Sequence, residues 1–115
     1  DWSKKYPVIK IDFFGDLRSG ESLEDTISSM LKSNQKKLGV ECDNTLKFGS
    51  CFKELIENCY EKYNQKVVVL VDEYDKAILD NLDQMDVARE NREIIKSLYT
   101  VLKGCEPYLE KVFLT

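Results

Sequence analysis

Two adjacent carboxylates, Asp72 and Glu73, follow directly after the apolar run Val67-Val68-Val69-Leu70-Val71. Such a run is typical of a strand buried on both faces, and ligands of open α/β sheets bind at the carboxyl ends of such strands. A carboxylate there can bind magnesium, and its neighbour can orient or deprotonate a water molecule. The pair therefore predicts a site for magnesium-assisted attack of water on a phosphate. An apolar strand that ends in Asp-Glu is the Walker B pattern of ATP-hydrolysing enzymes.

The sequence contains no histidine, which excludes Ser-His and Cys-His nucleophile pairs and histidine-ligated metal sites within this chain. The four cysteines form no C-x-x-C pair, so a zinc knuckle or a thioredoxin-type motif is not expected. Cys51 and Cys59 fall on the apolar side of a predicted helix, where we expect plain core thiols. A reducing cytoplasm fits this usage best, although composition alone does not exclude disulfides.

The chain has 115 residues, of which 43% are hydrophobic and 33% charged, as in an ordinary globular domain. No apolar stretch is long enough to span a membrane, and no signal peptide opens the chain. The net charge of −4 gives no reason to expect nucleic-acid binding.

Periodicity and punctuation predict strands and helices that alternate along the chain. The strands are expected at about 7–14, 66–72 and 110–115, and the helices at about 23–38, 46–63 and 87–103. Helical crossovers between buried strands imply a parallel sheet, so the predicted fold class is α/β with three parallel strands.

Local signals mark the ends of the helices. Ser22 is the expected N-cap of the first helix and Gly39 its C-terminal stop, while Asp83 or Asp86 can cap the third. The third helix has an expected inward face, made of Val87, Ile94, Ile95, Leu98, Tyr99 and Leu102.

The boundaries of the chain suggest a fragment of a larger α/β domain, because it starts just before a strand and stops at the end of one. The expected open sheet edge and uncovered sheet faces predict self-association by strand pairing or swapping.

Three segments resemble the bacterial AAA-ATPase-like family of P-loop NTPases, whose members often carry a C-terminal nuclease-like domain. The segments are 2–9 (WSKKYPVI), 67–76 (VVVLVDEYDK) and 108–115 (YLEKVFLT). The family usually has proline where Ala77 stands. The resemblance implies a three-layer partial P-loop NTPase core. In that family the phosphate-binding Walker A loop lies upstream of such a segment, and no G-x-x-x-x-G-K-[ST] occurs in this chain. In the family's topology the missing first strand lies beside the last strand of this chain.

The resemblance also implies roles for individual residues. Asp72 would bind magnesium, Glu73 would orient or deprotonate the attacking water, and Thr115, expected level with Glu73, would sense the γ-phosphate. Asp75 is either an outer carboxylate that supports the magnesium ligands or a helix cap. Lys76 is expected to be a surface or salt-bridging lysine.

For the other charged residues, structural or solvent-exposed roles are favoured over functional ones. Asp12 could face the same site, but a turn role is favoured. Arg89 and Arg92 could supply an arginine finger to a neighbouring subunit, but a solvated helix face is favoured, as it is for the cluster Lys32, Lys36 and Lys37.

The expected cofactors of the intact protein are ATP and Mg²⁺, neither of them bound tightly by this chain alone. We expect no ATP hydrolysis by the chain alone, because the phosphate loop supplies much of the positioning. Two alternatives stay open: a flavodoxin-like magnesium-binding signalling module, and a structural protein-interaction domain.

Overall fold

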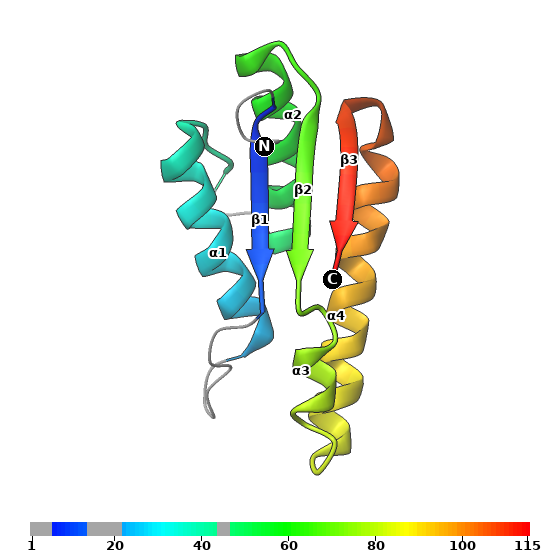
Figure 1. The fold of residues 1–115 in the computed structure, drawn as a ribbon. Coiled ribbons are helices and arrows are strands. Elements are labelled where there is room, and N and C mark those ends of the chain that lie inside the picture. Colours follow the sequence, from blue (N-terminus) through cyan, green and yellow to red (C-terminus); the bar gives the residue numbers. More distant parts are fainter. Residues whose placement is uncertain (1–5, 14–21, 44–46) are drawn as a thin grey trace.

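The computed structural model describes residues 6–13, 22–43 and 47–115, which form one parallel sheet with helical crossovers (Figure 1). The strands lie in the order β1-β2-β3, with bounds Val8–Asp12, Val67–Asp72 and Leu109–Leu114. The first crossover contains α1 (Leu23–Leu38) and α2 (Phe48–Tyr63). The second contains α3 (Lys76–Leu79), α4 (Met85–Gly104) and the 3₁₀ helix η2 (Glu106–Tyr108). The structure confirms the expected α/β class with three parallel strands.

The helix ends agree with the sequence signals for α1 and differ for α4. Ser22 caps α1 by accepting a hydrogen bond from the backbone N–H of Asp25 at 3.1 Å, and Gly39 ends the helix in the left-handed conformation with φ 68°. The N-cap of α4 is Gln84, so the expected cap at Asp83 or Asp86 is wrong. The expected strand position 14 and helix position 46 lie outside the described residues.

The α4 helix begins earlier than expected, at Met85, and its inward face also differs from the expected one. Val87 is 37% exposed, contrary to expectation, whereas Ala88 and Asn91 are buried. Ala88, Asn91, Ile95, Leu98 and Leu102 follow one another at spacings of three and four, so they form the continuous inward stripe of the helix.

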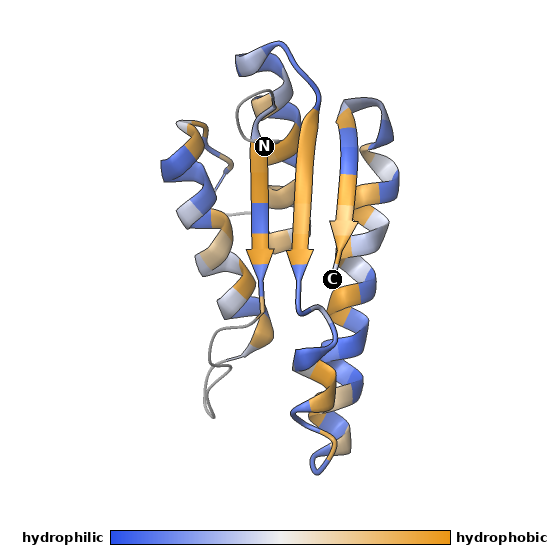
Figure 2. Ribbon diagram, in the orientation of Figure 1, coloured by the Kyte–Doolittle hydropathy of each residue, from blue (hydrophilic) through white to orange (hydrophobic). Residues whose placement is uncertain are grey.

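Alternate residues of the strands build the main core. Val67, Val69 and Val71 of β2 point to one face of the sheet, where α1, α2 and α4 cover them. The first crossover leads from β1 to its neighbour β2, and the second leads on in the same direction from β2 to β3. Because parallel crossovers are almost always right-handed, both crossovers lie on the same face of the sheet. Figure 2 shows β2 as apolar up to its last residue, Asp72, while β1 and β3 are interrupted by polar residues.

The opposite sheet face lies outside this core. It carries Val8, Val68, Leu70 and Phe113, none of which belongs to the main hydrophobic cluster. Within the part of the chain that the structure describes, the helices and the sheet therefore account for two of the three expected layers.

A side chain of α1 provides hydrogen-bond partners for the backbone at the outer edge of β1. Asn34 is 5% exposed, and its amide pairs with the backbone of Lys10 in both directions. Its Oδ1 accepts from the Lys10 N–H at 3.0 Å, and its Nδ2 donates to the Lys10 carbonyl at 2.9 Å. The Asp12 N–H contacts Met30 Sδ at 3.3 Å. The helix thus closes an edge that would otherwise offer unpaired backbone groups.

Residues 39–43, called here the return segment, run back along α2 from its end towards its start. Lys62 Nζ donates to the Gly39 carbonyl at 2.9 Å, Asn58 Nδ2 to the Glu41 carbonyl at 2.7 Å, and Glu54 Oε1 accepts from the Asp43 N–H at 3.2 Å. α1 and α2 therefore run in the same direction, with the return segment between them.

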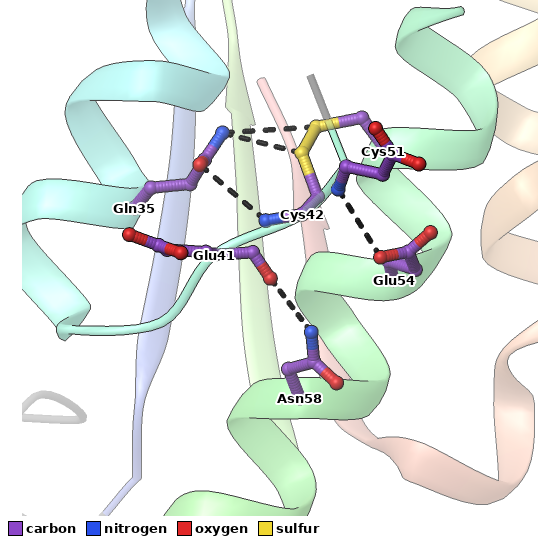
Figure 3. Close-up of a disulfide and its surroundings, with 7 residues drawn as sticks. Gln35, Glu41, Cys42, Cys51, Glu54 and Asn58 are labelled. Carbon is purple, nitrogen blue, oxygen red and sulfur yellow. Dashed lines mark hydrogen bonds between the residues drawn. A yellow bond between two sulfur atoms is a disulfide. The ribbon is translucent and has the colours of Figure 1, made fainter. Parts of the chain in front are cut away.

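A disulfide between Cys42 and Cys51 adds a covalent link to these hydrogen bonds (Figure 3). The expectation that Cys51 is a plain core thiol is therefore wrong, because the return segment brings Cys42 against the first turn of α2. Cys59 is a free, fully buried thiol, as expected.

Candidate functional site

The carboxyl ends of β1 and β2 bring two carboxylates into register. Asp12 pairs with Asp72, and the Phe13 N–H donates to the Asp72 carbonyl at 3.0 Å. Both side chains are half-buried and belong to the sheet face opposite the helices, because they alternate with Ile11 and Val71. Lys10 Nζ lies 3.9 Å from a carboxylate oxygen of Asp12. The strand ends thus present two carboxylates on one face of the sheet, with the Lys10 ammonium close to Asp12.

Thr115 joins this surface from the neighbouring strand. Its backbone N–H donates to the Val71 carbonyl at 2.9 Å, and its carbonyl accepts from the Tyr74 N–H at 3.3 Å. Its hydroxyl donates to Asp72 Oδ1. Thr115 does not lie level with Glu73, its expected position, because the register that pairs Val71 with Leu114 continues to Asp72 and Thr115.

Glu73 has an unusual backbone for a residue with a side chain. Its φ is 56°, in the left-handed region, which costs a non-glycine residue on the order of 1 kcal/mol or more. Its side chain is exposed, and its carbonyl accepts from the Lys76 N–H at 3.1 Å. The chain therefore turns sharply after β2, in a conformation that its neighbours must hold. The sequence gives no sign of this turn, because glutamate rarely adopts it.

Two tyrosines fasten this turn to α4. The rings of Tyr74 and Tyr99 pack edge to face, with centroids 6.3 Å apart. Burial raises the pKa of Tyr99, and Tyr74 and Asp75 raise it further. Tyr99 is expected on the inward face of α4, and its contact with Tyr74 carries no signal in the sequence.

Comparison of the sequence with known protein families and proteins identifies its family. The family model described as "Predicted AAA-ATPase" matches residues 1–115. The chain belongs to the AAA-ATPase-like family. A protein of Azotobacter chroococcum mcd 1, described as an uncharacterized protein in the vnfD 5′ region, is 40% identical over 119 residues. That match covers 100% of this chain and 22% of the relative, so the chain spans about a fifth of the relative's length. No solved structure matches the chain.

The residues after Glu73 in this AAA-ATPase-like chain form α3. Asp75 occupies the N-cap position but makes no side-chain capping hydrogen bond. Lys76 pairs with Asp80 at 2.8 Å, which agrees with its expected salt-bridging role. Arg89 and Arg92 are exposed on α4. The structure therefore joins Asp72 to Thr115 by a hydrogen bond and places Glu73 at the sharp turn that follows β2. Lys76 pairs within α3 and not with these groups.

The carboxyl ends of β1 and β2 offer two carboxylates, Asp12 and Asp72, as oxygen ligands that a metal ion could use. Among the described residues, no group of three or more Cys, Asp or Glu side chains could hold a metal ion. Magnesium commonly takes only one or two protein carboxylates and keeps water and phosphate oxygens as its other ligands. Asp72, with Asp12 beside it, fits that requirement.

None of the described helices combines the length and the apolar character that crossing a bilayer requires.

Proposed function

We propose that this chain carries the acidic part of an ATP-hydrolysing site, the Walker B element, in the full-length protein. Asp72 binds magnesium, Glu73 orients or deprotonates the attacking water, and Thr115 contacts the γ-phosphate or that water. The hydrogen bond from the Thr115 hydroxyl to Asp72 supports this proposal most directly. It links two of the three proposed groups at the carboxyl ends of adjacent parallel strands, where α/β sheets bind ligands.

The conformation of Glu73 supports its proposed role. A strained backbone at a strand end is a common property of functional sites. The left-handed φ of Glu73 turns the chain sharply. Hydrogen bonds of the Asp72 carbonyl before Glu73, and of the Tyr74 and Lys76 N–H groups after it, hold that turn. An exposed carboxylate on a fixed turn is able to reach a water molecule without a large rearrangement.

Bound magnesium would neutralise phosphate charge, and this chain would hold it through Asp72. The Thr115 hydroxyl orients the Asp72 carboxylate by donating to one of its oxygens. Asp75 has no capping hydrogen bond, so its place beside the turn favours the outer supporting role over the cap. A cytoplasmic location forms part of the same proposal.

The chain alone should not hydrolyse ATP. Its 115 residues contain no Walker A pattern, so neither the loop's backbone donors nor its lysine is available to anchor the phosphates. We expect weak binding of MgATP by the isolated chain and turnover only in the full-length protein.

The decisive experiment compares ATP turnover by the full-length protein with that of Glu73→Gln. Loss of a group that acts on the attacking water should lower kcat by a factor of roughly 100 or more, while nucleotide binding is retained. Glu90→Gln is the matched control, because Glu90 is an exposed glutamate on α4. Equal turnover by wild type and Glu73→Gln would refute the catalytic role.

The outer edge of β3 supports a second part of the proposal, self-association of the isolated chain. Among the described residues β3 has a strand partner only in β2, whereas α1 closes the other edge of the sheet. A largely apolar groove beside β3 is lined by Tyr99, Leu102, Leu109, Val112 and Leu114, with charged residues around them. Sedimentation of the isolated chain at rising concentration checks this, and a monomer throughout would contradict it.

A further inference from the structure

Cys42 and Cys51 meet where the return segment passes the first turn of α2. Their Cα atoms are 5.2 Å apart, inside the usual range for disulfides. Both residues are buried, with 6% and 7% of their surfaces exposed. The two sulfur atoms are therefore held together by the path of the backbone, which hydrogen bonds to α2 maintain on either side of Cys42.

Gln35 of α1 contacts both sulfur atoms. Its Nε2 lies 3.3 Å from Cys42 Sγ and 3.7 Å from Cys51 Sγ, and its Oε1 accepts from the Cys42 N–H at 3.4 Å. Figure 3 shows this amide facing the sulfur pair. An amide N–H that points at both sulfur atoms can stabilise a thiolate on either one, because it donates a hydrogen bond to the charge.

An open groove leads to the same amide. Gln35 lines this groove together with Val40, Glu41 and Asn58, and Lys32 and Lys36 lie along it. The sulfur pair is thus one side chain away from solvent. Two lysines and one glutamate give the groove a net positive charge, which favours an anionic reagent.

The other two thiols are poor competitors for such a reagent. Cys59 and Cys105 have no exposed surface. Burial raises the pKa of Cys59 to about 11, against an opposing effect of Lys62. Burial also raises the pKa of Cys105, and the negative charge of Glu57 raises it further, while the positive charge of Lys53 opposes the rise. Because the thiolate is the reactive form, oxidation should be confined to Cys42 and Cys51.

We propose that Cys42 and Cys51 are a reversible redox couple, oxidised by an anionic small-molecule disulfide of the glutathione type, whose oxidised form locks the return segment onto α2. One protein thiolate attacks a sulfur of the reagent, breaks its S–S bond and releases one thiol. The second protein thiolate then displaces the other half and forms the Cys42–Cys51 bond. The protein loses two electrons and two protons, and both appear in the two released thiols.

Reduction should loosen the return segment without unfolding the domain. The hydrogen bonds from Asn58 to the Glu41 carbonyl and from the Asp43 N–H to Glu54 do not require the disulfide. The covalent bond restricts the same stretch of chain, so its loss should raise the rate at which those hydrogen bonds open.

The test uses full-length protein, reduced and then equilibrated with glutathione and glutathione disulfide at a series of ratios. Alkylation and peptide mapping should find the Cys42–Cys51 link rising with the oxidised fraction, with Cys59 and Cys105 alkylated only after denaturation. Cys51→Ser should stop at a mixed disulfide on Cys42, whereas Cys59→Ala, the matched control, should leave the link unchanged.

A second measurement follows the return segment directly. Hydrogen exchange of peptides covering 39–43 should be slower in the oxidised protein, on the order of tenfold or more. Failure of the link to form with glutathione disulfide, or oxidation mainly at Cys59 or Cys105, would overturn the proposal. Equal exchange in the oxidised and reduced proteins would overturn the locking of the segment.

Discussion

Replacing Asn34 with alanine should open the outer edge of β1. The Asn34 side chain makes three hydrogen bonds: it accepts from the Lys10 N–H and donates to the Lys10 and Met30 carbonyls, at 3.0, 2.9 and 2.8 Å. Alanine makes none of them, so the two backbone groups of Lys10 lose their partner in a place where only 5% of Asn34 is exposed.

The size of the effect follows from these bonds. Each hydrogen bond contributes a net free energy of about 1 kcal/mol, which gives about 3 kcal/mol in total. Alanine regains up to about 0.7 kcal/mol through its higher helix propensity. The net loss of about 2 kcal/mol corresponds to roughly a 30-fold increase in the population of the opened edge.

Hydrogen exchange measures this opening in the full-length protein. Peptides covering residues 6–13 should exchange roughly 30-fold faster in Asn34→Ala than in wild type. Ser33→Ala is the matched control, because Ser33 is the exposed neighbour on the same helix and gains a similar helix propensity. Exchange in Asn34→Ala within about twofold of that in Ser33→Ala would refute the idea that this side chain closes the edge.

Two further predictions concern Thr115 and Cys59. Thr115→Val keeps the β-branched shape and the backbone bonds to β2 but removes the hydroxyl that donates to Asp72. ATP turnover by the full-length protein should therefore fall on the order of tenfold, Thr115→Ser should restore it, and a fully active valine variant would contradict the proposed role. Burial raises the pKa of Cys59 from 9.0 to about 11, so its neutral thiol contributes full stability below pH 9 and loses that contribution as the pH rises towards 11. Urea unfolding across this range should show a stability decline that is weaker in Cys59→Ala, and parallel declines in both proteins would count against this account.

Much of the fold is encoded in local patterns that a reader of the sequence can recognise. The apolar run Val67–Val71 predicts β2 because a strand covered on both sides needs apolar residues at every position. The ends of α1 are equally local, since a serine cap and a left-handed glycine act within one turn of the helix. Where a local signal was ambiguous, as in the acidic stretch before α4, the expected cap and inward position Val87 were wrong.

Long-range contacts were beyond such reasoning. Cys42 meets Cys51 only because the return segment runs back along α2, and nothing in the spacing of the cysteines specifies that path. In the sequence, Asn34 is only a polar residue on the apolar side of an amphipathic helix. Its role becomes clear from the structure, where it binds the backbone of Lys10 at the edge of β1. The left-handed φ of Glu73 likewise depends on neighbours contributed by β3 and α4.

The pairing of Asp72 with Thr115 has a consequence for the order in which the domain folds. These residues are 43 positions apart, and Val8 and Val68, which pair across β1 and β2, are further apart still. Closing such long loops costs chain entropy before any contact compensates for it, so distant strand pairs form slowly while helices such as α4 form quickly. We therefore expect the strand ends that carry the acidic residues to be among the last parts of the chain to acquire their final arrangement. A protein caught before that step would have its helices and much of its core but no assembled Asp72–Thr115 pair.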